Sequence, residues 1–86
     1  ADGLDVFRST VPVSMRDKTL ATSGLREKTG CNLVAIETDG TLVGNPGADV
    51  VLNADTGLIL IGDDAGQERL ANLNDGWRAR LRRRMA

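Results

Sequence analysis

The chain has 86 residues, of which 41% are apolar but only 2% aromatic, with one cysteine and no histidine. A domain of this length buries only about 60–65% of the surface that its unfolded chain exposes, so its core is thin. One cysteine excludes an internal disulfide, and the lack of histidine excludes histidine-based catalysis and the commonest zinc ligand. We therefore expect a module that gains buried area by association, not an enzyme.

The formal net charge of −1 combines two regions of opposite sign. Residues 1–76 contain six basic and all twelve acidic side chains, a net charge of −6, whereas residues 77–86 contain five arginines and no acid, a net charge of +5. This pattern predicts an acidic domain followed by a basic C-terminal tail. With Leu73 as the last apolar residue of the final predicted helix, we place the domain over residues 1–73 and the tail over residues 74–86. The acidic body argues against nucleic acid as a partner of the domain.

The sequence carries no signal for membrane insertion or secretion. No segment has the roughly 20 consecutive apolar residues of a membrane span, and the N-terminus lacks a basic region followed by an apolar stretch. The chain begins at Ala1, which indicates either processing or a piece of a longer protein. Together with the unpaired cysteine, these features predict a reducing, cytoplasmic location.

The first element in chain order is a strand, and the second is a helix. Residues 4–13 mix apolar and polar positions and predict a strand that ends at Pro12, which has no backbone N–H for the ladder. Thr19 is a suitable N-cap for a short helix over residues 20–29. Gly24 weakens this helix, so its stability should depend on packing.

The middle of the chain predicts a turn, a strand and a hairpin. Gly30 occupies the position where a left-handed residue ends the helix. Residues 33–36 are all apolar and predict a central strand covered on both faces. Asp39-Gly40 is a strong signal for a two-residue hairpin turn, and a turn cluster over residues 44–47 ends its second strand.

The last part predicts two extended segments and a helix. Residues 50–52 are extended, and residues 58–62 form a second fully apolar strand. Asp64 opens a helix with Gln67 as the reciprocal half of a capping box, and residues 74–76 end it. The element order is β-α-β-β-(β)-β-α, which predicts an α+β fold with helices covering a small sheet.

Two interpretations of residues 77–86 stay open. Trp77 and Leu81 lie four residues apart among arginines, a spacing typical of a basic amphipathic helix that docks on a partner or an anionic membrane. Alternatively, the segment is a frayed and solvated terminus.

The sequence gives catalysis and metal binding little support. Cys31 at the start of a predicted strand is interpreted as a small buried apolar residue. Asp63 and Asp64 are placed where a helix needs caps, so capping is favoured over cation binding. No phosphate-binding glycine loop is present. We expect no catalytic and no metal-ligating residue.

One set of residues combines a cation, amides and apolar side chains near the ends of a predicted helix, strand and hairpin. Its members are Arg26, Asn32, Leu33, Asn45 and Pro46. If these ends converge, Arg26 offers a guanidinium fork to a phosphate or carboxylate. Alternatively, Arg26 is a surface residue that pairs with a nearby acid such as Glu27 or Asp49.

Two segments of the chain fit a known family pattern: LREKTGCNLVAI over residues 25–36 and LVGNP over residues 42–46. They resemble the TrkA C-terminal domain, also called the RCK C-terminal domain. The opening strand and the apolar strand over residues 58–62 that ends in glycine fit the same pattern, so the resemblance covers roughly residues 4–73. Asp55-Thr56 stands where the family commonly has glycine-aspartate, and the basic tail lies outside the pattern. A TrkA-C-like fold is therefore expected.

The resemblance implies a non-enzymatic regulatory module of a potassium channel or cation transporter, located in the cytoplasm at the inner face of the membrane. Family members pair as homodimers and are attached to a nucleotide-binding RCK N-terminal domain and a membrane transport protein. Several bind an effector between the two copies, which is cyclic di-AMP in one branch and a divalent cation in others. The positions that resemble the nucleotide-contacting ones are Leu25, Arg26, Asn32, Leu33 and Pro46.

Two other functions remain open at the level of the sequence. The first is a purely structural dimerisation or assembly module that binds no ligand. The second is an adaptor that binds a membrane surface or nucleic acid through residues 77–86, although no nucleic acid is expected for the domain itself.

Overall fold

An antiparallel sheet organises the molecule. The computed structural model describes residues 3–85, and the side chains of residues 3–74. Four strands lie in the order β1-β6-β3-β4, so β6 and β3 occupy the centre, and β2 and β5 form a separate small sheet. The strands are β1 Asp5–Thr10, β2 Lys18–Thr19, β3 Asn32–Thr38, β4 Thr41–Gly44, β5 Val51–Leu52 and β6 Gly57–Gly62.

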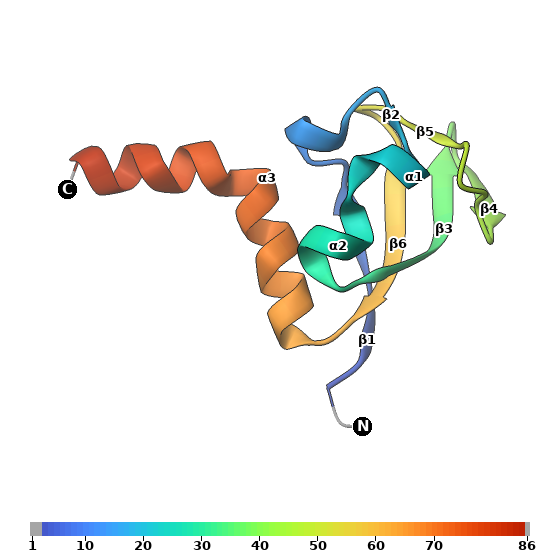
Figure 1. Cartoon of the computed structure of the whole chain (residues 1–86), viewed down its shortest axis with the longest axis horizontal. Coiled ribbons are helices and arrows are strands. Elements are labelled where there is room, and N and C mark those ends of the chain that lie inside the picture. The colour runs from blue at the N-terminus through green and yellow to red at the C-terminus, as the bar shows by residue number, and fades with distance from the viewer. Residues whose placement is uncertain (1–2, 86) are drawn as a thin grey trace.

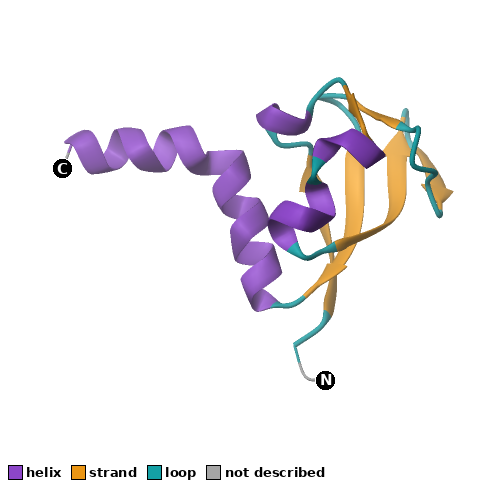
Figure 2. Cartoon of the chain, viewed as in Figure 1, coloured by secondary structure: helices purple, strands orange, loops and turns teal. Residues whose placement is uncertain are grey.

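The helices lie to one side of the strands (Figure 1, Figure 2). They are α1 Leu20–Ser23, α2 Leu25–Thr29 and α3 Asp64–Met85, and a single 3-10 turn spans Val13–Met15. This arrangement of helices on an antiparallel sheet confirms the predicted α+β class. Within residues 3–85, no helix is both long enough and apolar enough to cross a membrane.

The hydrophobic core lies between the helices and one face of the sheet. Leu58 and Leu60 of β6 are fully buried, whereas Ile59 between them points to the other face and is half-buried. Leu25 of α2 and Leu70 of α3 belong to the same buried cluster as the two β6 leucines. The helices therefore cover the leucine face.

The prediction that residues 33–36 are covered on both faces is wrong for half of the segment. Ala35 and Ile36 are buried, but Leu33 and Val34 are only half-buried. The register between β3 and β6 shifts between Leu33 and Ala35, which marks a bulge at Val34. An apolar run therefore overstates burial here, because the helices cover one face only.

Gly24 divides the predicted helix over residues 20–29 into α1 and α2. Its φ of 74° is left-handed, so the helical hydrogen-bond ladder stops there. Both predicted ends of the segment over residues 20–29 are confirmed. The Thr22 N–H donates to the Thr19 hydroxyl at 3.2 Å at its start, and Gly30 is left-handed with a φ of 76° at its end.

The first strand is shorter than predicted. β1 ends at Thr10, and Val11 and Pro12 are buried where the chain leaves the sheet. The Met15 N–H donates to the Pro12 carbonyl at 2.9 Å, so the proline starts the 3-10 turn instead of ending the strand.

The hairpin between β3 and β4 is confirmed. Asp39 has a φ of 51° and Gly40 a φ of 77°, the positive values that a two-residue type I′ turn needs at both positions. Thr38 and Thr41 pair directly across it.

The start of α3 differs from the predicted capping box. Asp63 is the cap, because its Oδ1 accepts from the Gly66 N–H at 2.7 Å. The Gln67 side chain instead donates to Asp5 Oδ2 at 3.2 Å and so connects α3 to β1.

The end of α3 also differs from the prediction. Residues 74–76 do not end the helix, which continues to Met85. A glycine within a helix costs only about 1 kcal/mol relative to alanine, and the arginine, leucine and alanine residues after Gly76 favour helix. The side chains of residues 75–85 lie outside the described set, so both interpretations of the basic tail remain untested.

Cys31 is fully buried and packs against two glycines. A β-carbon at Gly62 would lie 2.5 Å from the Cys31 sulfur, and one at Gly66 would lie 2.8 Å from it. Neither glycine has a positive φ, so space and not backbone conformation requires glycine at both positions.

We predict that Gly62→Ala lowers the free energy of unfolding by about 1–3 kcal/mol, because the new methyl group overpacks the core. Gly44→Ala is the matched control and should have little effect, since nothing lies within 4 Å of the position of its β-carbon. Adding Cys31→Ala to Gly62→Ala should recover part of the loss. Urea denaturation measures the wild type, the three single mutants including Cys31→Ala, and the double mutant, and additivity of the Gly62→Ala and Cys31→Ala effects would contradict the assigned contact.

An ion pair crosses β6 on the face away from the helices. The Arg8 guanidinium on β1 donates to the Glu37 carboxylate on β3 in two bonds of 2.8 and 3.1 Å. Gly57 of β6 lies opposite Glu37, and its lack of a side chain leaves room for the pair. The hydrogen bonds from Arg8, and then its charge, hold the pKa of Glu37 below its usual value, and Glu37 raises the pKa of Arg8.

The lowered pKa gives the ion pair a defined pH dependence. The pKa of Glu37 is lower in the folded than in the unfolded protein, so the ion pair stabilises the fold at pH values above the unfolded pKa of about 4.3. This stabilisation is lost as the pH falls through the folded pKa of Glu37. We expect the wild type to exceed Glu37→Gln in stability at pH 7 and the difference to vanish at low pH. Thermal melts across this range test it, and a pH-independent difference would contradict the ion pair.

Candidate ligand-binding site

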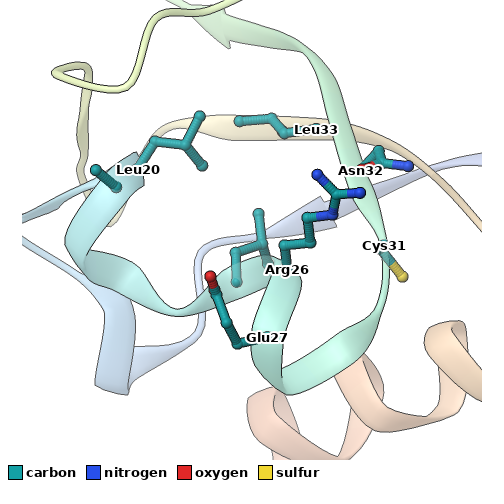
Figure 3. Close-up of a pocket in the computed structure, with 8 residues that line it drawn as sticks. Leu20, Arg26, Glu27, Cys31, Asn32 and Leu33 are labelled. Atoms are coloured by element: carbon teal, nitrogen blue, oxygen red, sulfur yellow. The ribbon is translucent and has the colours of Figure 1, made fainter.

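Helices α1 and α2 and the start of β3 line a cavity of about 230 Å³ (Figure 3). Four residues that the sequence singled out line it: Leu25, Arg26, Asn32 and Leu33. Four further residues line it: Leu20, Ala21, Glu27 and Cys31. The cavity is therefore built by two short helices and one strand that are continuous in sequence.

The turn between α2 and β3 determines the shape of the cavity. Thr29 is fully buried, and its hydroxyl donates to the Leu25 carbonyl at 2.6 Å and accepts from the Cys31 N–H at 3.1 Å. The Gly30 N–H donates to the Arg26 carbonyl at 2.7 Å. These bonds fix the direction in which the chain leaves α2, so the side chains of α2 and β3 reach the same space.

Arg26 has no ionic partner among the described side chains. In residues 3–74, the ion pair that forms joins Arg8 and Glu37. The alternative that Arg26 pairs with Glu27 or Asp49 is therefore not realised. Successive residues on a helix point about 100° apart, which keeps the Arg26 and Glu27 side chains from facing each other.

The positive side of the cavity faces β3. The Arg26 guanidinium points toward the start of β3, where Asn32 lies, and both side chains are exposed (Figure 3). A guanidinium presents five N–H donors, and an amide adds two donors and an acceptor. This donor-rich wall suits a phosphate or carboxylate group of a ligand.

The floor of the cavity is apolar. Leu25 is 1% exposed, and Leu20 and Leu33 are half-buried against the core. Leu20 and Ala21 fall within the helix predicted over residues 20–29, but the sequence pattern did not connect them with the site. The break at Gly24 changes the direction of the chain between α1 and α2, and residues of both helices line the cavity.

Asn45 and Pro46 do not line the cavity. The Asn45 N–H donates to the Val34 carbonyl at 2.9 Å, and its φ of 52° is left-handed, so this residue shapes the turn after β4. Pro46 is half-buried. The sequence grouped these two residues with Arg26 on the condition that the ends converge. Within one copy of the domain they lie outside the cavity, and a role for them in ligand binding stays a prediction.

The cavity offers its polar groups to an anion more than to a metal ion. Its wall carries one guanidinium, one amide and the single carboxylate of Glu27, while the Cys31 thiol is buried. In the described part of the chain, no three histidine, cysteine or acidic side chains come together as metal ligands would.

Comparison with known proteins identifies the family. Residues 6–74 match the family model of the TrkA-C domain. The chain belongs to the TrkA-C domain family. This confirms the resemblance and the TrkA-C-like fold inferred from residues 25–46. No curated protein gives a match.

Solved structures share the TrkA-C fold. The GsuK channel is 34% identical over 84% of this chain with a TM-score of 0.73, and the crystal structure of the GsuK RCK domain is 34% identical over 87% with a TM-score of 0.75. The chain spans only 14% and 17% of those two chains. It therefore corresponds to a small part of each.

Two more distant structures show the same fold. The RCK C domain of the potassium transport protein KtrA, in complex with cyclic di-AMP, is 22% identical over 79% of this chain and 80% of its own, with a TM-score of 0.70. The RCK_C domain dimer of Streptococcus agalactiae BusR, also with cyclic di-AMP, is 19% identical over 85% of this chain and 96% of its own, with a TM-score of 0.71. BusR has also been solved with promoter DNA, where this chain spans 37% of the BusR chain.

We predict that Thr29→Val destabilises the TrkA-C domain by about 1–3 kcal/mol, because the buried Cys31 N–H loses its acceptor. Thr29→Ser keeps the hydroxyl and should retain most of the stability. Thr41→Val on the exposed strand β4 is the matched control and should be near neutral. Chemical denaturation measures the three variants, and equal stability of Thr29→Val and wild type would contradict the role of the hydroxyl.

Proposed function

We propose that this TrkA-C domain is a ligand-sensing and dimerisation module that regulates a potassium channel or cation transporter without catalysing a reaction. The observation that carries the proposal is the cavity in which Arg26, with no ionic partner among the described side chains, adjoins Asn32 over an apolar floor. An exposed arginine in a cavity with an apolar floor is suited to bind an anionic ligand that also has an apolar part.

Cyclic di-AMP is the effector that fits these requirements best. It combines phosphates, which suit the guanidinium and amide, with flat bases, which suit the leucine floor. The related domains of KtrA and BusR were solved with this ligand. A divalent cation is the other candidate effector, and the GsuK channel, solved with NAD, adds a third ligand to test.

The size of the cavity supports binding by two copies. Pockets that enclose a drug-sized ligand measure about 300–1,000 Å³, and this cavity of about 230 Å³ lies below that range. One copy can therefore enclose about half of a two-base ligand, and a second copy would contact the other half. The BusR domain was solved as a dimer with cyclic di-AMP, which supports the same arrangement here.

Shared binding provides a regulatory mechanism. A ligand held between two copies favours the relative orientation in which both cavities reach it, and this differential affinity is typically worth about 1–3 kcal/mol of coupling. We propose that this preference for one orientation is transmitted through an attached nucleotide-binding domain to a membrane transport protein, at the cytoplasmic face of the membrane. The 34% identity to part of the GsuK channel supports this assignment.

We predict that Arg26→Ala weakens binding of cyclic di-AMP by about 10- to 150-fold, the effect of losing charge-assisted hydrogen bonds worth about 1.5–3 kcal/mol. Lys28→Ala removes the same charge from an exposed position of α2 outside the cavity, and it should bind like the wild type. Isothermal titration calorimetry should give one ligand per two chains.

Parallel titrations with calcium, magnesium and NAD distinguish the other candidate effectors. If the folded wild type responds to none of these ligands, the ligand-sensing proposal is wrong. In that case, sedimentation velocity decides whether a purely structural dimer remains.

A further inference from the structure

Arg26 and Glu27 both line the cavity, but their charged groups lie in different places. The Arg26 guanidinium points toward Asn32 at the start of β3, and the Glu27 carboxylate lies on the side of the cavity away from Asn32 (Figure 3). Glu27 is exposed and forms no ion pair among the described side chains. Its oxygens therefore remain available to a ligand.

The side of the cavity with Arg26 and Asn32 and the side with Glu27 suit different chemical groups of a ligand. The side formed by Arg26 and Asn32 is rich in donors and suits an anionic group, whereas an ionised carboxylate is purely an acceptor. Glu27 therefore repels a phosphate but accepts a hydrogen bond from an N–H group. The apolar floor of Leu20, Leu25 and Leu33 belongs to the same cavity. A matching ligand has an anion, a flat apolar body and an N–H donor.

We propose that Glu27 is a specificity-determining residue that accepts a hydrogen bond from the exocyclic amino group of an aminopurine nucleotide whose phosphate binds Arg26. The inference rests on the proposed function, since it concerns the same cavity. It goes further by assigning recognition of the base to a carboxylate that the sequence suggested only as an ionic partner of Arg26. Glu27 lies in the first turn of α2, directly after Arg26, so one five-residue helix carries both groups.

The test compares two ligands that differ only in the amino group. The first is cyclic di-AMP, and the second is its analogue in which each adenine is replaced by unsubstituted purine. Both are titrated by calorimetry into the wild-type chain, Glu27→Ala, Arg26→Ala and Glu68→Ala. Glu68 is an exposed residue of α3 outside the cavity, so its variant controls for the loss of one negative charge.

The wild type and Glu68→Ala should bind cyclic di-AMP at least about tenfold more tightly than the purine analogue, as expected for a hydrogen bond to a charged group. Glu27→Ala should bind both ligands with similar affinity. Arg26→Ala should weaken both and keep the preference. Thermal melts establish that each variant is folded.

The outcomes separate this inference from the proposed function. If the wild type binds both ligands equally, or if Glu27→Ala keeps the preference, the role of Glu27 is overturned while ligand sensing stands. If the wild type binds neither ligand, the cyclic dinucleotide assignment is overturned, and the role of Glu27 with it.

Discussion

The close approach of the α2–β3 turn to the corner between β6 and α3 is the contact on which the rest of the structure depends. Cys31 is buried beside Gly62 and Gly66, and a side chain at either glycine would collide with its sulfur. Arg69 of α3 donates to the Thr29 carbonyl at 3.4 Å in the same region. Because this contact holds α2 against the sheet, it also fixes the cavity that α2 shares with β3.

The sequence predicted the features that local chemistry determines and missed those that depend on distant neighbours. The Thr19 cap and the left-handed Gly30 need only their own residue type and the adjacent backbone, and both are confirmed. The break at Gly24 is tolerated because α1 and α2 each pack separately on the core. Gln67 does not close a capping box, because Asp5 offers its carboxylate from a strand 62 residues away in sequence.

The same difference between local and long-range features applies to the candidate site. Leu25, Arg26, Asn32 and Leu33 were predicted together, and they line one cavity because a single tight turn separates them. Asn45 and Pro46 were grouped with them on the condition that the hairpin end folds back to α2, and Pro46 also because its position resembles a nucleotide-contacting one of the family. That position depends on sheet register and on the bulge in β3, which no local pattern encodes. Glu27 was considered as a partner of Arg26 because it is adjacent in sequence, although adjacent residues on a helix diverge.

The adjacency of Arg26 and Glu27 also affects how fast a ligand arrives. The fields of opposite charges on neighbouring residues largely cancel at a distance, and salt screens what remains beyond a Debye length of about 8 Å at physiological ionic strength. The cavity therefore exerts little attraction on a distant anion. Residues 1–76 carry a net charge of −6, and the five arginines of residues 77–86 reduce the net charge of the whole chain to −1. With so small a net charge, association gains little from electrostatic steering. Differences in affinity between anionic ligands then arise mainly from contacts at the binding site and appear as differences in residence time.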